Sequence, residues 1–172
     1  MCGIYGVVMR QEKATQKVKL GLKRLEYRGY DSWGIAVAKE QGLVLNKKVG
    51  EVGLIKKLSL PVGRVALGHT RWATHGGVTR RNAHPHLAQD GSFAVVQNGV
   101  VENHQQLKQE LFESGYEFKS ETDTEIIVGL LAELSQQKNE AVPSLETVSQ
   151  IAARLEGRNT IALITQNQEL LA

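Results

Sequence analysis

Short runs of apolar, β-branched and aromatic residues alternate along the chain with stretches in which apolar residues recur every three or four positions. Runs of the first kind are typical of β-strands, and patterns of the second kind are typical of amphipathic helices. The predicted strands span residues 3–8, 34–38, 43–48, 64–69, 93–97 and 160–165. This alternation is compatible with several mixed folds and does not single out one of them.

Helices are predicted between these strands. The first ends before Gly29, and the second lies between Asn103, as its N-cap, and Gly115. The last starts near Ser144 and ends at Gly157. These boundaries rest on the residue types that favour helix starts and stops.

The remaining helix is the best marked, because Thr122-Asp-Thr-Glu125 is a capping-box pattern followed by apolar residues at helical spacing. Residues 70–91 form a long polar segment rich in His, Gly and Asn, and such a segment inside a compact domain is usually functional. Asn167-Gln168 predicts a turn, and the last four residues predict the start of a return strand. We therefore expect the domain to be incomplete at its C-terminus.

The composition is that of one soluble globular domain of 172 residues, with 41% apolar and 23% charged residues. The net charge is +3 and the basic pairs are scattered, so no nucleic-acid partner is expected. A single cysteine excludes an internal disulfide and a multi-thiolate zinc site. Neither a signal peptide nor an apolar run approaching about 20 residues is present, which predicts no membrane partner and a cytoplasmic location.

The single cysteine occupies position two, directly after the initiator methionine. Removal of Met1 would make Cys2 the N-terminus, with a thiol and a free α-amine on one residue. An α-amine has a pKa of roughly 7.7–8.0 and could take the thiol proton directly or through one water. The alternative is a small buried residue at the start of a strand, and position alone does not decide between the two.

Six motifs, taken together and in this order, resemble the glutamine amidotransferases of the N-terminal-nucleophile type, and most of all the glutaminase domains of glutamine–fructose-6-phosphate aminotransferases. They are CGIYG (2–6), EYRGYDS (26–32), HTRWATHG (69–76), NAHPH (82–86), NGVVEN (98–103) and SETDTE (120–125). The resemblance implies an α+β fold, a four-layer αββα sandwich with two antiparallel sheets. It also implies hydrolysis of L-glutamine to glutamate and ammonia through a γ-glutamyl thioester, without a cofactor.

The resemblance also assigns roles to particular residues. The expected catalytic residues are Cys2, Asn98 and Gly99, and the expected substrate-binding residues are Arg71, Trp72, Thr74, His75, Gly76 and Asp123. The chemistry agrees, since an oxyanion needs fixed hydrogen-bond donors and an arginine can grip an α-carboxylate with two parallel bonds. An aspartate can likewise hold the ammonium group of an amino acid.

Several of these residues also have a plainer structural explanation. Asn98-Gly99 could be a hairpin turn, and Arg71 could belong to a surface ion pair. Asp123 could be a carboxylate favoured in the first turn of a helix, and Trp72 could be a core residue. Taken one at a time, these residues do not decide between the structural and the functional role.

Two further features bear on the site. His84-Pro85-His86 lacks a thiolate or acidic partner, so no metal is predicted. Trp33 stands where the family usually has a small residue, and its large side chain would reshape the pocket if it packed near the nucleophile.

The sequence contains nothing that would bind or isomerise a sugar phosphate. The resemblance implies two partners, L-glutamine and a sugar-phosphate isomerase domain, absent here, that would use the ammonia to form glucosamine 6-phosphate from fructose 6-phosphate. A homodimer is expected for the full enzyme. The alternatives are a non-catalytic glutamine-binding or regulatory module on the same scaffold and an amidohydrolase acting on another amide.

Overall fold

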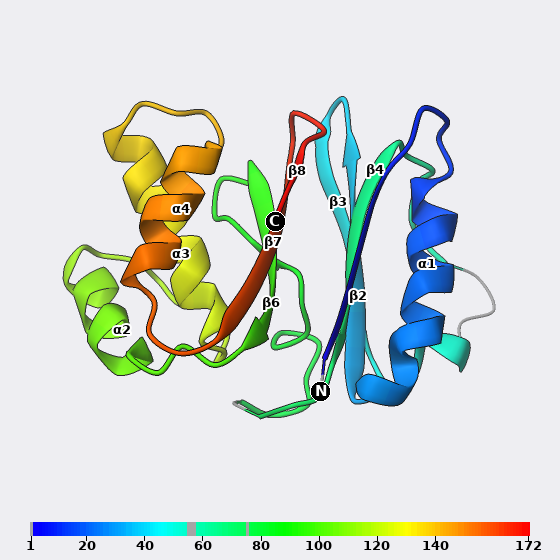
Figure 1. Ribbon diagram of the computed structural model, residues 1–172, viewed down its shortest axis with the longest axis horizontal. Helices are drawn as coiled ribbons and strands as arrows, with labels where there is room; N and C mark the ends of the chain where they lie inside the picture. Colours follow the sequence, from blue (N-terminus) through cyan, green and yellow to red (C-terminus); the bar gives the residue numbers. More distant parts are fainter. Residues whose placement is uncertain (1, 55–57, 75) are drawn as a thin grey trace.

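The computed structural model describes residues 2–54, 58–74 and 76–172. Two antiparallel sheets lie face to face, with helices on both outer faces (Figure 1). The first sheet has the strand order β1-β4-β2-β3, and the second sheet has the order β5-β6-β7-β8. The strands are β1 Gly3–Val8, β2 Ser32–Lys39, β3 Gly42–Val49, β4 Val65–Arg71, β5 His86–Leu87, β6 Phe93–Gly99, β7 Asn159–Thr165 and β8 Leu170–Leu171.

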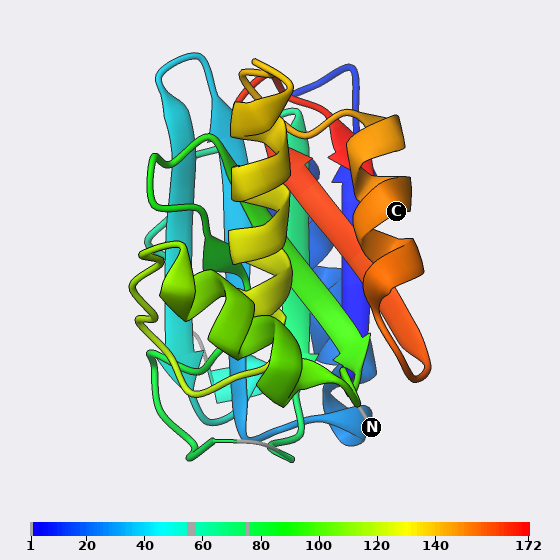
Figure 2. The same ribbon diagram turned by 90° about the vertical axis from the view of Figure 1, so that its left-hand side faces the viewer.

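The helices are divided unequally between the two outer faces. They are α1 Ala14–Leu25, α2 His104–Glu113, α3 Thr124–Gln137 and α4 Leu145–Arg154, with short 3₁₀ turns at Glu26–Arg28 and Val52–Leu54. Helix α1 covers the first sheet, and α2, α3 and α4 cover the second (Figures 1 and 2). The expected four-layer αββα architecture is confirmed. None of the helices in the described part of the chain is long and apolar enough to cross a lipid bilayer.

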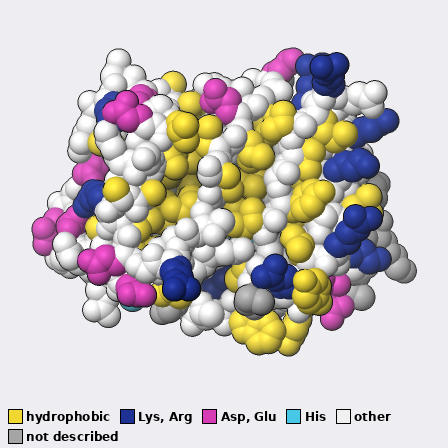
Figure 3. Space-filling view, viewed as in Figure 1, with side chains coloured by type: hydrophobic (Ala, Val, Ile, Leu, Met, Phe, Trp, Pro, Cys, Tyr) yellow, Lys and Arg dark blue, Asp and Glu magenta, His cyan; other side chains and the backbone are white. Residues whose placement is uncertain are grey.

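Apolar side chains fill the three spaces between the four layers. The space between α1 and the first sheet and the space between the second sheet and its helices hold mostly large residues. The space between the two sheets is lined by smaller ones: Ala36, Ala38, Val65, Leu67, Ala94, Val96, Ala162 and Ile164. On the face shown in Figure 3, apolar side chains gather along the middle of the molecule, over the edge strands β1 and β8.

The hydrophobic pattern predicted most of the strands correctly. All six predicted strands are present, and the predicted return strand is β8. Strand β5 was missed because it has only two residues, His86–Leu87, and so carries no periodicity. Strand β4 runs two residues beyond the predicted end and therefore includes Arg71.

The capping box predicted for α3 is wrong. The Glu125 carboxylate accepts hydrogen bonds from the backbone N–H groups of Lys119 and Ser120 instead of closing on Thr122. The Thr122 hydroxyl lies 2.9 Å from Nε2 of His86. The polar groups at this helix start therefore tie α3 to the preceding loop and to the second sheet.

The other predicted N-cap, Asn103, occupies that position of α2, but its side chain bonds to the carbonyl of Arg154 and the N–H of Glu156, at the end of α4. The last helix starts after Ser144, close to the predicted start. Ser144 caps it, since its hydroxyl accepts from the N–H of Thr147 at 3.2 Å. The Asn103 side chain thus makes a tertiary contact, whereas Ser144 is a true cap.

Trp33 does not reach the candidate pocket. Its side chain is 1% exposed and packs with Ile35 and Val37 beneath α1, on the outer face of the first sheet. Because side chains alternate along a strand, Ala36 and Ala38 face the other sheet instead. The condition under which Trp33 would reshape the pocket, packing near the nucleophile, is therefore not met, because the residue belongs to the outer core.

Candidate active site

Pairing of the two strands β1 and β4 brings Cys2 to the end of the first sheet. Gly3 lies opposite Thr70 in the antiparallel register, so Cys2 lies beside the residues that end β4. The backbone N–H of Trp72 donates to Cys2 Sγ at 3.3 Å, and Sγ lies 3.6 Å from the Trp72 carbonyl oxygen. The thiol is thus held at the end of the first sheet by the backbone of Trp72, and it is not buried in the core.

Asn98 and Gly99 approach Cys2 from the second sheet. They are the last residues of β6 and pair in register with Thr160 and Asn159, so the alternative of a hairpin turn is wrong. The Asn98 side-chain amide Nδ2 donates to the Cys2 carbonyl oxygen at 3.2 Å. The amide of one sheet therefore lies at the cysteine of the other.

Gly99 occupies a position that no other residue could take without strain. Its φ is +136°, and a Cβ atom there would lie 2.2 Å from the carbonyl oxygen of Arg158. The backbone can make this turn beside Cys2 because no side chain is present.

Arg71 is a buried cation and not part of a surface ion pair. Its side chain is 4% exposed, and its guanidinium donates to the carbonyl oxygens of Gly77 at 3.2 Å and Gly76 at 3.5 Å. Burial lowers the pKa of the Arg71 guanidinium. Electrostatic interactions with Cys2 and Asp123, among other groups, act in the opposite direction and raise that pKa. The positive charge is thus close to both of these residues.

Asp123 immediately precedes α3, but its carboxylate does not cap that helix. Oδ2 accepts a hydrogen bond from the backbone N–H of Val101 at 2.8 Å, in the loop that follows β6. The carboxylate is therefore oriented by the end of the second sheet, beside Asn98 and Gly99. A role confined to the first turn of the helix does not explain this orientation.

Two adjoining pockets contain most of the expected site residues. Both are lined by Cys2, Trp72, Thr74 and Gly99. One of them extends to Arg71 and Asp123, and the other extends to Asn98. The structure therefore brings together residues from both sheets and from the start of α3. Trp72 is 44% exposed, so it forms part of the pocket wall and is not a core residue.

Two predicted residues remain. His75 lies outside the described residues, and Gly76 lies on the loop after β4. Gly76 has a φ of +72°, and a Cβ atom there would lie 2.9 Å from Nδ2 of Asn82 and 3.0 Å from Cβ of Glu121. The close approach at Gly76 is thus to protein side chains, and its carbonyl oxygen contacts Arg71.

Several lining residues were not predicted. They are Arg28, His84, Gln97, Val100, Thr122, Thr124 and Thr160. Most of them belong to or adjoin the quoted motifs, and that proximity was the sequence signal that could have found them. The pattern of a motif does not show which of its members face a cavity.

A cluster of buried histidines lies behind the pocket. The rings of His69 and His84 are 4.3 Å apart between centroids, and those of His84 and His86 are 4.9 Å apart. Burial lowers the pKa of His69 to about 4 and the pKa values of His84 and His86 well below their usual range, with repulsion from Arg71 as a further cause. Within residues 2–54, 58–74 and 76–172, no group of three or more His, Cys, Asp or Glu side chains is arranged to hold a metal ion.

These histidines predict acid destabilisation. The unfolded chain binds protons on histidine near pH 6.5, whereas folded His69 does so only near pH 4, so lowering the pH favours unfolding across that window. The shift of His69 alone corresponds to roughly 3 kcal/mol of lost unfolding free energy. Urea denaturation at a series of pH values from 7.5 to 4 measures this effect.

The matched control for that series is His69→Gln, which removes one of the titrating groups and is expected to flatten the pH dependence between pH 6.5 and 5. Carboxylates titrate mainly below this range, so they do not mask the result. An unfolding free energy that stays constant from pH 7 to 5 would contradict the prediction.

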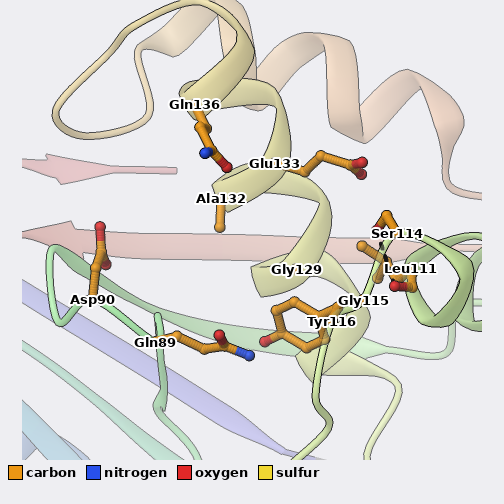
Figure 4. A pocket seen from close by; sticks show the side chains of 10 residues that line it. All are labelled: Gln89, Asp90, Leu111, Ser114, Gly115, Tyr116, Gly129, Ala132, Glu133 and Gln136. Atoms are coloured by element: carbon orange, nitrogen blue, oxygen red, sulfur yellow. Dashed lines mark hydrogen bonds between the residues drawn. The ribbon is translucent and has the colours of Figure 1, made fainter.

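Another cavity lies on the far side of the second sheet, between α3 and the loops around Gln89 and Tyr116 (Figure 4). Asp90, Glu133 and Gln136 also line it. It contains no thiol, and the Asp90 carboxylate is occupied by the N–H and hydroxyl of Ser92. The Ser114 hydroxyl, which also lines it, donates to the Leu111 carbonyl oxygen. We therefore take the cavity at Cys2, which holds the single thiol of the sequence, as the candidate active site.

Comparison with known proteins identifies the family of the chain. The family described as glutamine amidotransferase domain matches residues 56–158. The glutamine–fructose-6-phosphate aminotransferase of Streptomyces coelicolor is 49% identical over 168 residues, which cover 95% of this chain and 27% of the relative. That of Sulfurisphaera tokodaii is 44% identical over 183 residues, covering 99% of this chain and 31% of the relative.

Solved structures show the same fold. One described as the allosteric regulatory enzyme of purine biosynthesis has a TM-score of 0.80 and 28% identity, over 96% of this chain and 36% of the other. Glutamine phosphoribosylpyrophosphate amidotransferase from B. subtilis has a TM-score of 0.74 and 27% identity, over 96% and 35%. The chain spans less than a third of the length of the two aminotransferases named above. By its family match, its fold and its relatives, the chain belongs to the glutamine amidotransferase family.

Proposed function

We propose that the chain hydrolyses L-glutamine to glutamate and ammonia, with Cys2 as the nucleophile. The observation that carries this proposal is the convergence in one place of the sole thiol, a buried guanidinium, an oriented carboxylate and a side-chain amide donor. A thiol with nearby oxyanion donors suits acyl transfer, and opposite charges side by side suit the head group of an amino acid.

The reaction follows from these groups. Cys2 sulfur attacks the carboxamide carbon, and the resulting oxyanion is stabilised by the Asn98 side-chain amide and the Gly99 backbone N–H. The C–N bond then breaks, ammonia leaves with a proton supplied by the α-ammonium of Cys2, and a γ-glutamyl thioester remains. Water, deprotonated by the same amine, hydrolyses the thioester and regenerates the thiol.

The amine can act in this way only after Met1 has been removed, because an amide nitrogen is not basic. Met1 lies outside the described residues, so this part of the proposal is chemical. The intact mass of an active preparation tests it directly, and full activity with the initiator methionine retained would refute the assignment of the base.

Substrate selection is assigned to the charged pair. Arg71 would hold the α-carboxylate of glutamine, and Asp123 would hold the α-ammonium through the carboxylate edge not engaged by Val101. Trp72 and Thr74 would form the wall, with Gly76 on the adjoining loop. His75, which lies outside the described residues, stays a predicted substrate-binding residue. This requirement for both charges argues against the alternative of an amidohydrolase for other amides. A non-catalytic glutamine-binding module has lost its main support, because Trp33 lies outside the pocket.

The ammonia would be consumed by a sugar-phosphate isomerase domain, in the same polypeptide or as a partner, to form glucosamine 6-phosphate from fructose 6-phosphate. Support comes from the relatives named above, in which the matched region is less than a third of the length. A homodimer is proposed for the full enzyme only. The cytoplasm is the proposed compartment, because a catalytic thiol has to stay reduced.

The test is release of glutamate and ammonia in equal amounts from L-glutamine. Asp123→Asn is expected to raise KM roughly 10- to 100-fold, since a charge-assisted bond to the substrate ammonium is worth about 1.5–3 kcal/mol. The amide oxygen of the variant can still accept from Val101, so the fold is retained. Glu113→Gln removes an exposed carboxylate on α2 and serves as the charge-matched control.

An unchanged KM in Asp123→Asn would contradict the assignment of this residue. Equal turnover of L-glutamine and of a γ-carboxamide lacking the α-amine would contradict the proposed substrate class as a whole.

A further inference from the structure

His69 connects the two sheets at the end where the pocket lies. It is a fully buried residue of β4, and its ring reaches the end of β6 in the other sheet. Nε2 lies 3.0 Å from the backbone carbonyl oxygen of Gln97 and 2.9 Å from Oδ1 of Asn98. The mechanism above gives this ring no part, although it touches a residue of the oxyanion hole.

These contacts fix the proton on the His69 ring. Both neighbours of Nε2 are oxygen acceptors, so Nε2 must carry a hydrogen. Nδ1 has no hydrogen-bond partner among the described residues. In a neutral ring with its hydrogen on Nε2, Nδ1 carries no hydrogen and is therefore an unpaired acceptor, not an unpaired donor. Since burial keeps the pKa of His69 near 4, the ring is neutral at physiological pH.

The same contacts fix the orientation of the Asn98 amide. Its Nδ2 donates to the Cys2 carbonyl oxygen at 3.2 Å while Oδ1 accepts from His69. If the amide were turned by half a rotation, Nδ2 would meet the Nε2–H donor and Oδ1 would meet the Cys2 carbonyl oxygen. Both contacts would then be repulsive, so only one orientation satisfies all the groups.

We infer that His69 is a positioning residue of the oxyanion hole: its Nε2–H holds the Asn98 amide with the nitrogen directed toward Cys2. The inference rests on the proposed glutamine hydrolysis, and it adds to it a residue that does not line the pocket. A side-chain amide aligned before the reaction stabilises the oxyanion without reorganisation. An amide free to rotate would present its oxygen to the oxyanion part of the time.

The test is a double-mutant cycle on glutamine turnover. His69→Phe keeps a buried ring but removes the donor, and it is expected to lower kcat roughly 10- to 100-fold with KM within about 3-fold. His69→Gln places an amide N–H near the same point and is expected to restore kcat to within about 5-fold of the parent. In an Asn98→Ala background, His69→Phe should change kcat less than about 3-fold, since its target is gone.

His86→Phe is the matched control, because it removes an equally buried ring that contacts Thr122 and not Asn98. We expect its kcat to stay within about 3-fold of the parent, even where its thermal stability falls as far as that of His69→Phe. If His69→Phe lowered kcat as much in the Asn98→Ala background as in the parent, His69 would have a purely structural role and the inference would be overturned. A His69→Phe variant with the parent kcat would overturn it too.

A measurement on the unmutated chain keeps the inference testable if a variant fails to fold. The ¹⁵N shifts of the His69 imidazole report which nitrogen carries the proton, and protonated Nε2 with unprotonated Nδ1 is expected at pH 7. The opposite tautomer would overturn the inference whether or not glutamine is hydrolysed. Absence of turnover in the parent with the expected tautomer would instead refute the proposed function, so the two failures are distinguishable.

Discussion

Replacement of Cys2 by alanine is expected to reduce glutamine hydrolysis by at least about 10⁴-fold, because none of the other described residues that line the pocket carries a thiol to form the thioester. Glutamine binding should remain, with Kd within about 3-fold, since Arg71 and Asp123 are untouched. Turnover by a coupled glutamate assay and binding by calorimetry measure the two effects separately. Alanine is as small as cysteine, so it leaves initiator-methionine removal unaltered.

An electrophilic glutamine analogue supplies the control for this experiment. It should add once to the parent chain and not at all to Cys2→Ala, as read from intact mass. Retention of more than about one hundredth of the parent turnover in Cys2→Ala would exclude Cys2 as the nucleophile.

Trp33→Ala is expected to lower the unfolding free energy by about 3–5 kcal/mol, the usual cost of removing a large aromatic side chain from a core. The ring is 1% exposed beneath α1, and that layer cannot close over the cavity without moving the helix. At temperatures where the variant stays folded, kcat/KM should remain within about 3-fold of the parent. Denaturant unfolding and steady-state kinetics on the same preparation test both statements.

Trp72 is the matched control, because it is the other tryptophan of the chain and is 44% exposed at the pocket. Trp72→Ala should cost little stability and should raise KM for glutamine. The reverse pattern, with Trp33→Ala affecting KM and Trp72→Ala affecting stability, would show that the two side chains have been assigned to the wrong places.

The strands were predictable from sequence because each buries one or both faces, and burial leaves a pattern of apolar residues. Strand β5 was not, since two residues leave no pattern. The helix starts were predicted to within a few residues, but the use of their polar groups was not. Glu125 and Asn103 fit capping roles in sequence, and only tertiary contacts decide that they bond elsewhere.

The candidate site was predictable to the extent that motifs mark it, and Cys2, Arg71, Asn98 and Asp123 lie close together as expected. The motifs could not show in which direction each side chain points. His69 stands two residues before Arg71 in the same motif, yet its link to Asn98 depends on the stacking of two sheets. The sequence likewise left open on which side of its sheet Trp33 lies, because that follows from the strand register.

The narrow layer of alanines and other small side chains between the sheets has a consequence for how the enzyme could lose activity. The proposed nucleophile, Cys2, lies at the end of one sheet, and the proposed oxyanion donors, Asn98 and Gly99, end a strand of the other. Their separation therefore depends on how the two sheets pack against each other. A displacement of about 1 Å between reacting groups can cost about 100-fold in rate. Substitutions of these small residues between the sheets are therefore expected to lower kcat while the chain stays folded. Turnover of glutamine would then report how well the two sheets are aligned.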